Sequence, residues 1–310
     1  MDTLLILLVA LVIDLALGEP PRIIHPVAWM GKATSLWERG GTGRPSLVQL
    51  IYGVGMTLIT VGIFAISAYF ILFYLKSLNF IAYVVVGAML LKSTFSLREL
   101  WQVARKVKRL LLKEKLDEAH FELRSLVSRD TRGLPKPLLI SATVESVAEN
   151  LSDSFVAPLF YFLLLGVPGA MAYRVVNTLD AMVGYHGQYE YLGKFVSRLD
   201  DVLNFIPARL TALLLVLATF LSKGKSQTMW QTVLHEQAKT ESPNAGWPMA
   251  AMAGGLGVQL EKVGHYRLEG GGARLMPDTI DAALKLMLIS ALSWVVICLI
   301  VGVIYFVLAP

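Results

Sequence analysis

The chain has 310 residues, of which 55% are hydrophobic and 16% are charged, and its mean hydropathy is +0.59. This composition excludes an ordinary soluble globular protein and predicts an integral membrane protein. The formal net charge is +5, but the basic residues gather in loops beside apolar segments, which is typical of membrane topology and argues against nucleic acid as a partner. The single cysteine, Cys298, lies in an apolar run and excludes an intrachain disulfide.

The N-terminal stretch, residues 3–17, is apolar except for Asp14. It is shorter than the roughly 20 residues of a bilayer span, so its topology stays open. The loop after it is fixed by prolines and carries His25. Asp14 and His25 are candidates for the edge of a functional site; the alternative is that Asp14 lies at the membrane interface and the prolines merely turn the chain.

Two apolar stretches, residues 47–75 and 78–95, are long enough to form a transmembrane hairpin. A polar excursion, residues 96–154, follows and is rich in Lys and Arg, which predicts a cytoplasmic location by the positive-inside rule. Most of these cations are expected to form a solvated face near anionic headgroups. Arg129 and Arg132 are exceptions, because they precede an acidic segment and are candidates for bidentate contacts to phosphate or carboxylate.

That acidic segment carries Glu145, Glu149 and Asp153 at spacings i, i+4 and i+8. On a helix these carboxylates share one face, and apolar residues occupy the opposite face. Because like charges at this spacing repel, the ridge is expected to need solvent, a basic neighbour or a cation. Carboxylate oxygens are ligands that Mg²⁺ prefers, so the ridge is a candidate magnesium site.

An apolar passage, residues 155–176, comes next and is broken by the tetrapeptide Gly166 to Gly169. Each half is too short to cross a bilayer, which predicts a re-entrant helical hairpin with the Gly-Pro break at its tip. Polar residues return after it, and the candidates among them are Asn177, Asp180, Arg198, Asp201 and Asn204.

Residues 205–221 are apolar but interrupted early by Pro207 and Arg209, so their topology also stays open. A second polar excursion, residues 223–283, carries Asn244 in a Pro/Gly loop, and residues 284–308 form the clearest transmembrane helix. The chain has no P-loop, no dinucleotide fingerprint, no zincin motif and no G-x-S-x-G. Any chemistry must therefore use Asp, Glu, Asn and Arg.

Several ordered motifs then become recognisable, and together they resemble the CbiB/CobD family of adenosylcobinamide-phosphate synthases over nearly the full chain. The motifs are D-L-A-L-G-E-P-P from Asp14, R-D-T from Arg129, E-S-V-A-E-N-L-S-D from Glu145, N-T-L-D-A-M-V-G-Y from Asn177, R-L-D-D-V-L-N-F-I-P-A-R from Arg198 and S-P-N-A-G-W-P-M-A-A-M-A-G from Ser242. The resemblance implies one all-α domain over residues 1–310, a polytopic membrane protein with a re-entrant hairpin and cytoplasmic helical excursions.

The resemblance also implies an enzyme, a carbon-nitrogen ligase of cobalamin biosynthesis in the cell membrane. It would join adenosylcobyric acid, a corrinoid, to (R)-1-amino-2-propanol O-phosphate or a related amino alcohol, with ATP as co-substrate. Such amide formation needs an activated carboxylate, most simply an acyl phosphate, with Mg²⁺ and cations to stabilise the phosphates.

The candidate residues fall into three roles under this hypothesis. The catalytic candidates are Glu145, Glu149, Asp153, Asn177, Asp180 and Asp201, the first three also as Mg²⁺ ligands. The substrate-binding candidates are Arg129, Arg132, Arg198, Asn204, Arg209, Asn244, Asp14 and His25.

Two other functions stay open at this stage. Related membrane proteins associated with β-lactamase induction resemble the same fold, so a non-catalytic signalling or regulatory protein is one alternative. A corrinoid transporter is another, although it would be expected to have several polar breaks in its long spans. The sequence is compatible with a homo-oligomer and does not specify the amino alcohol or the nucleotide site.

Overall fold

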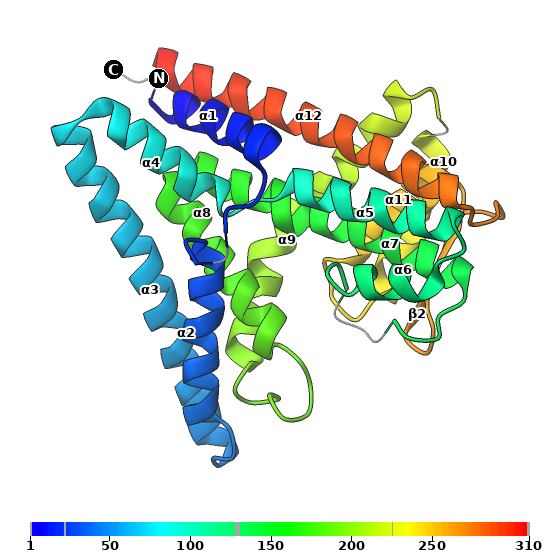
Figure 1. The fold of residues 1–310 in the computed structure, drawn as a ribbon, viewed down its shortest axis with the longest axis horizontal. Coiled ribbons are helices and arrows are strands. Elements are labelled where there is room, and N and C mark those ends of the chain that lie inside the picture. The colour runs from blue at the N-terminus through cyan, green and yellow to red at the C-terminus, as the bar shows by residue number, and fades with distance from the viewer. Residues whose placement is uncertain (1, 22, 128–130, 225, 309–310) are drawn as a thin grey trace. The chain divides into compact units, whose positions relative to one another are not determined.

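The protein is described here from a computed structural model, which places residues 2–21, 23–127, 131–224 and 226–308 (Figure 1). Helices dominate it, as the composition predicts, and the only strands in those ranges are two short ones. The helices are α1 (Asp2–Leu17), α2 (Pro26–Gly41), α3 (Ser46–Leu78), α4 (Phe80–Lys92), α5 (Leu97–Leu112), α6 (Leu116–Leu123), α7 (Lys136–Leu151), the π-helix η1 (Ser152–Val156), α8 (Ala157–Val183), α9 (Lys194–Leu221), α10 (Ser226–Glu236), the 3₁₀-helix η2 (Gln237–Lys239), α11 (Gly246–Leu256) and α12 (Pro277–Leu308). The strands are β1 (Gln259–Lys262) and β2 (Tyr266–Glu269).

Five helical stretches are long and apolar enough to cross a membrane, so the protein is a multi-pass membrane protein. They are Ser46–Leu78, Phe80–Leu112, Lys136–Val183, Lys194–Leu221 and Pro277–Leu308. The helix α9 settles one open point, because it runs through Pro207 without ending and includes the polar segment from Arg198 to Asn204 in its first turns. The apolar residues 205–221 are thus the second part of a longer helix.

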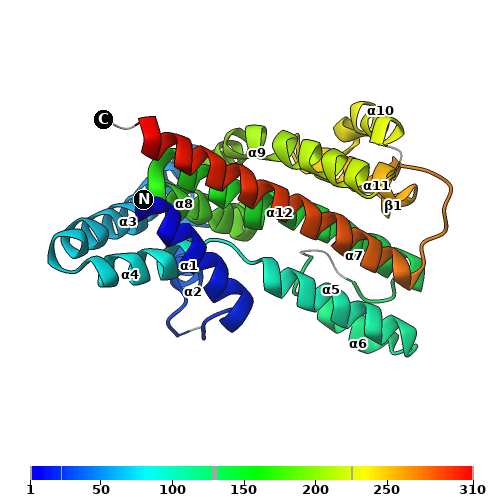
Figure 2. The same ribbon diagram turned by 90° about the horizontal axis from the view of Figure 1, so that it is seen from above.

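The chain folds into two compact units. Unit 1 comprises residues 1–96, 157–204 and 298–310, and unit 2 comprises residues 97–156 and 205–297. In unit 1, α3 packs on α8, α1 on α4, and α2 on both α3 and α8. Asn79 joins α3 to α4: its backbone N–H ends α3, and its side-chain oxygen accepts a hydrogen bond from Ala82 N at 3.0 Å to begin α4. Figures 1 and 2 show the resulting pair of neighbouring helices.

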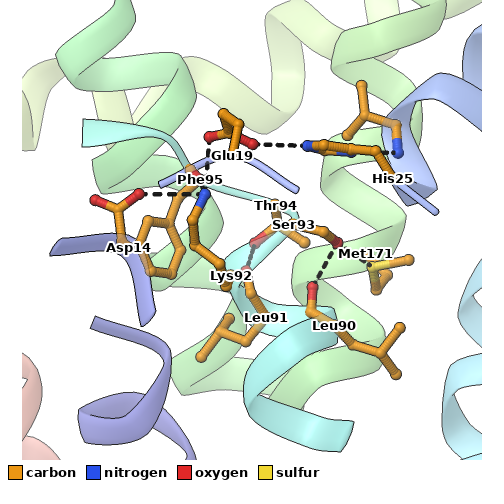
Figure 3. A network of polar contacts seen from close by, with 11 residues as sticks. Asp14, Glu19, His25, Leu90, Leu91, Lys92, Ser93, Thr94, Phe95 and Met171 are labelled. Carbon is orange, nitrogen blue, oxygen red and sulfur yellow. Dashed lines mark hydrogen bonds and ion pairs between the residues drawn. The ribbon is translucent and has the colours of Figure 1, made fainter. Parts of the chain in front are cut away.

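A buried ion cluster ties α1, the proline loop and α4 together inside unit 1 (Figure 3). The Lys92 side chain is 2% exposed, and its Nζ lies 3.2 Å from Asp14 Oδ1 and 2.8 Å from Glu19 Oε1, while donating to the Phe95 carbonyl at 3.2 Å. Two of these oxygens, from Glu19 and Phe95, accept hydrogen bonds from the ammonium, and Asp14 pairs with it by charge. Asp14 is accordingly a counter-ion in the core of unit 1 and does not lie at an interface with water.

His25 completes this cluster as the N-cap of α2. Its Nδ1 accepts a hydrogen bond from Val27 N at 3.1 Å, so the ring proton is on Nε2, which donates to Glu19 Oε2 at 2.7 Å. Both ring nitrogens are thus engaged. Burial opposes ionisation of Glu19, but its hydrogen bonds to His25 and Lys92 outweigh that effect and lower the pKa of Glu19 from 4.5 to about 2.

The helix α8 folds back on itself at Gly166, which confirms the predicted hairpin. Twelve residues of straight helix would separate Tyr161 from Tyr173 by about 18 Å, yet their rings stack with centroids 5.2 Å apart. Gly166 has φ 67° and ψ −163°, a conformation that is essentially restricted to glycine. Gly169 instead allows the backbone after the turn to lie close to the backbone before it, since a Cβ there would lie 2.8 Å from the Tyr161 carbonyl oxygen. The arms differ from those predicted: the first continues α7 and η1, and the second extends to Val183.

Unit 2 is built around α7, which packs on α5, α6, α11 and β1. Helix α5 is amphipathic, and its buried face consists of Leu97, Leu100, Val103, Ala104, Val107 and Leu111. Its basic face is partly paired, because Lys108 donates to Asp278 at 2.6 Å and also to Asp281. The strands β1 and β2 form an antiparallel hairpin with Leu260 opposite Leu268, and both leucines are buried.

The conformation of Gly166 generates a first prediction. The change Gly166→Ala should destabilise the protein by about 1–3 kcal/mol, because a Cβ is strained in this part of φ/ψ space. Thermal unfolding of the purified protein in detergent measures the effect. Gly55→Ala in α3 is the matched control, since nothing lies within 4 Å of the added Cβ, and it should leave the midpoint unchanged or raise it. Equal midpoints for Gly166→Ala and the wild type would contradict the strained reversal.

The ion cluster generates a second prediction. Because the pKa of Glu19 is lowered, its ionised form contributes stability that is complete above about pH 4.5 and is lost as the pH falls towards 2. The unfolding midpoint of the wild type should therefore exceed that of Glu19→Gln at pH 7, and the difference should shrink below about pH 4.5. A difference that stays constant down to pH 3 would show that the carboxylate's charge is not what stabilises this cluster.

Candidate functional site

Two carboxylates lie near each other in unit 1, one towards the end of α8 and one near the start of α9. Asp180 lies in the last turn of α8, Asp200 lies in the second turn of α9, and their charges repel. Oδ1 of Asp180 and Oδ1 of Asp200 are both buried and accept no hydrogen bond from the part of the chain that the structure describes. A buried, unpaired carboxylate oxygen is costly. Two of them in one place make the Asp180–Asp200 pair the best candidate for binding a cation.

The neighbours of this pair fix the positions of its carboxylates. Asn177 lies one turn before Asp180 and near Asp200, and its Oδ1 accepts from Arg174 at 3.3 Å. Ser197 lies within hydrogen-bonding reach of Asp180. A Cβ at Gly184 would lie 2.1 Å from Asp180 Oδ1. The absence of a side chain at Gly184 therefore leaves room for the Asp180 carboxylate.

Asn204 links Asp200 to the hairpin of α8. Its Nδ2 donates to Asp200 Oδ2 at 2.9 Å, and its Oδ1 accepts from the Tyr173 hydroxyl at 2.8 Å. Asn204 is 2% exposed and Tyr173 is 1% exposed.

The carboxylate of Asp201, next to Asp200, is 3.6 Å from the exposed guanidinium of Arg198 and contributes a further negative charge near Asp180. Unit 1 thus brings together five of the predicted residues, namely Asn177, Asp180, Arg198, Asp201 and Asn204.

The predicted acidic ridge lies in unit 2, where Glu145 is buried and not exposed to the solvent that the ridge was expected to need. That side chain is 4% exposed, and its two oxygens accept from Ser141 at 2.6 Å and from Tyr266 at 2.7 Å. Ser141 in turn accepts from Glu261 N at 2.8 Å. The sequence pattern failed here because α7 is covered on several sides, so its polar face is buried along with its apolar face. Glu145 holds the β-hairpin against α7.

Glu149 and Asp153 are half-buried, and each has further interactions within the protein. Asp153 does not continue the α-helical spacing, because it lies in η1, where π-type turns change the angular position of each residue. Within the described ranges, no group of three or more His, Cys, Asp or Glu is arranged to hold a metal ion. Geometric support for a three-carboxylate magnesium site on this ridge is therefore lacking.

Two further candidates in unit 2, Arg209 and Asn244, form one cluster. The NH1 of Arg209 donates to the Phe205 carbonyl at 2.7 Å and to Asn244 Oδ1 at 3.2 Å. The guanidinium also lies over the rings of Phe205 and Trp247, 3.6 Å and 4.6 Å from their centroids. Two of the recognised motifs, from Arg198 and from Ser242, thus meet through Arg209 and Asn244. Arg132 lies in the exposed loop before α7, and Arg129 is outside the described residues.

Three residues of these clusters were missed by sequence reasoning. Lys92 was hidden because it ends an apolar helix and resembles an ordinary interfacial lysine. Asp200 is adjacent to the predicted Asp201, and sequence alone does not tell which side of α9 faces α8. Tyr173 looked like a core aromatic residue. One signal could have found Lys92, namely a lysine without a basic neighbour inside a predicted span.

Comparisons with known proteins agree with the motifs. A family model described as CobD/Cbib protein matches residues 7–306. The cobalamin biosynthesis protein CobD of Dehalococcoides mccartyi is 53% identical, over 99% of both chains. Two proteins named probable cobalamin biosynthesis protein CobD are also similar: that of Methanothermobacter thermautotrophicus is 42% identical over 86% of this chain and 87% of its own, and that of Pyrococcus furiosus is 40% identical over 94% and 96%. No solved structure matches the chain.

A family model that matches nearly the whole chain, together with a relative 53% identical over 99% of it, shows that this protein belongs to the CobD/CbiB family of cobalamin biosynthesis proteins.

Proposed function

We propose that this protein is an adenosylcobinamide-phosphate synthase. It would join the free propionate carboxylate of adenosylcobyric acid to (R)-1-amino-2-propanol O-phosphate, or a related amino alcohol, with ATP as co-substrate. Family membership supports a place in cobalamin biosynthesis, and a membrane protein of this pathway has a corrinoid substrate. The observation that carries the chemistry is the pair of buried, unpaired oxygens on Asp180 and Asp200.

The reaction would proceed by phosphoryl transfer followed by acyl transfer. A propionate oxygen attacks the γ-phosphorus of ATP, the bond to ADP breaks, and an acyl phosphate forms. The amine nitrogen then attacks the acyl carbon, loses a proton to solvent and expels inorganic phosphate, which leaves the amide. Phosphoryl transfer of this kind is catalysed mainly by positioning and by electrostatic stabilisation, so it requires fixed cations around the phosphates.

The residues of this chain fit a bound Mg²⁺ at the Asp180–Asp200 pair better than at the ridge of α7. Mg²⁺ commonly uses one or two protein carboxylates and takes its remaining ligands from water and phosphate. Asp180 and Asp200 each offer one unpaired, buried oxygen, whereas both oxygens of Glu145 accept hydrogen bonds. When bound, Mg²⁺ would neutralise charge that develops on the transferred phosphoryl group.

The cationic and amide side chains would bind the anionic groups of the substrates. Arg198 is well exposed beside Asp201 and is suited to contact a phosphate. Arg209 keeps a fixed orientation between two aromatic rings, with Asn244 as its partner, which suits a planar carboxylate or a phosphate. Because ATP and the corrinoid precursor are cytoplasmic, the site would face the cytoplasm, and the protein would lie in the cell membrane.

The first test replaces one carboxylate of the pair. Asp200→Asn in the purified, full-length protein should abolish ATP- and Mg²⁺-dependent formation of the amide, measured by mass spectrometry, since the amide side chain has no charge for the cation. Glu190→Gln removes a carboxylate from an exposed loop of the same unit and should leave turnover unchanged. Near-normal turnover by Asp200→Asn at saturating Mg²⁺ would contradict the metal assignment, and failure of the wild type to form the amide would contradict the ligase.

The second test separates the Asp180–Asp200 pair from the ridge of α7. Glu145→Gln should lower the stability of unit 2 by roughly 1–3 kcal/mol, since it replaces an acceptor oxygen by a donor between two hydroxyls. The Mg²⁺ concentration for half-maximal activity should stay as in the wild type. A strong rise in this concentration, with unchanged thermal stability, would instead support Glu145 as a metal ligand.

A further inference from the structure

Asp200 is oriented by a chain of hydrogen bonds that starts at Tyr173 in the returning arm of the α8 hairpin. The Tyr173 hydroxyl lies 2.8 Å from Asn204 Oδ1, and Asn204 Nδ2 lies 2.9 Å from Asp200 Oδ2. The first bond is buried and the second is partly buried, and each joins residues within unit 1. The other oxygen of Asp200 is the one without a hydrogen-bond partner in the described ranges.

The direction of these bonds is determined by chemistry. An ionised carboxylate only accepts, so the Asn204 side chain must present its NH₂ group to Asp200. Its carbonyl oxygen then points to Tyr173, whose hydroxyl can donate to it. The tyrosine thereby selects the orientation of the amide, and the amide occupies Oδ2 of Asp200.

We propose that Asn204 and Tyr173 are positioning residues that hold Asp200 so that its Oδ1, together with Asp180, can bind a divalent cation. This inference rests on the proposed function, because it deepens the role of the Asp180–Asp200 pair. It also changes the role expected for Asn204: both polar atoms of its side chain are engaged and the residue is buried, so it serves the carboxylate and does not contact substrate. Hydrogen bonds to groups that ligate metals commonly control affinity by 10–100-fold.

The structure offers a matched control in Tyr161. Its ring stacks on that of Tyr173 at 5.2 Å and 13°, and its hydroxyl donates to the carbonyl of Leu203 at 2.8 Å. Both tyrosines therefore give a hydrogen bond to the same turn of α9, but only Tyr173 reaches Asn204. Changing either one to phenylalanine removes a single hydroxyl and keeps the stacked rings.

The experiment compares the wild type, Tyr173→Phe, Tyr161→Phe and Asp200→Asn as full-length protein in detergent. Mn²⁺, a paramagnetic substitute for Mg²⁺, is titrated, and the free ion is measured by electron paramagnetic resonance without substrates. Thermal unfolding is recorded in parallel. Tyr173→Phe should weaken Mn²⁺ binding by about 10-fold or more, whereas Tyr161→Phe should bind like the wild type although it also loses a hydrogen bond to α9. In ligation assays, Tyr173→Phe should raise the Mg²⁺ requirement more than it lowers turnover at saturating Mg²⁺.

Each other outcome has a distinct meaning. Loss of Mn²⁺ binding in Asp200→Asn, with unchanged binding in Tyr173→Phe, would overturn the positioning role and leave the proposed metal site intact. Equal weakening by Tyr161→Phe and Tyr173→Phe would also overturn it, since packing would then explain the effect. Mn²⁺ binding that is the same in all four proteins would overturn both proposals. Should Tyr173→Phe fail to fold, Asn204→Ala removes the same link and carries the same expectation.

Discussion

The reversal of the chain at Gly166 is the constraint on which the candidate site depends. Without it, Tyr161 and Tyr173 would be far apart on one helix, and the arm that carries Asn177 and Asp180 would point away from the first half of α8. A positive φ at a single glycine redirects the helix within one residue. Stacking of the two tyrosines then closes the hairpin, and both hydroxyls reach α9. The position of Asp180 therefore depends on the backbone conformation of Gly166, which lies fourteen residues earlier in the chain.

Two groups of charges inside unit 1 illustrate different solutions to the cost of placing ions in an apolar environment. Around Lys92, one ammonium lies between the carboxylates of Asp14 and Glu19 and donates to the Phe95 carbonyl, so opposite charges balance there and that cluster contributes to structure. At the α8–α9 junction, like charges are close together and two oxygens remain unpaired. Folded proteins rarely keep such a deficit unless a ligand compensates for it. This contrast is the physical reason for placing function at the second group.

The acidic motif on α7 shows how a pattern of carboxylates can have more than one explanation. Glu145 belongs to a motif of the family, and its spacing from Glu149 is that of a helical face. In the structure it anchors a β-hairpin through Tyr266 and Ser141. A buried carboxylate with two hydroxyl donors is a satisfied structural group. Motif membership therefore identifies residues that matter, and contacts decide how they matter.

The sequence by itself determined the membrane class, the hairpin at the Gly-Pro break, the amphipathic α5 and the family, because these depend on local composition, periodicity and motif order. It also named most residues of the candidate site, among them Asp180 and Asn204. Only the tertiary structure decided that Asp200 lies near Asp180 with one unpaired oxygen, that Asn204 hydrogen-bonds to Tyr173, that Lys92 is the centre of an ion cluster, and that Glu145 is buried. These are questions of which helix faces meet. The sequence of one helix does not specify which neighbouring helix each of its faces will contact. The pairing of side chains distant in sequence is therefore settled only when the helices pack.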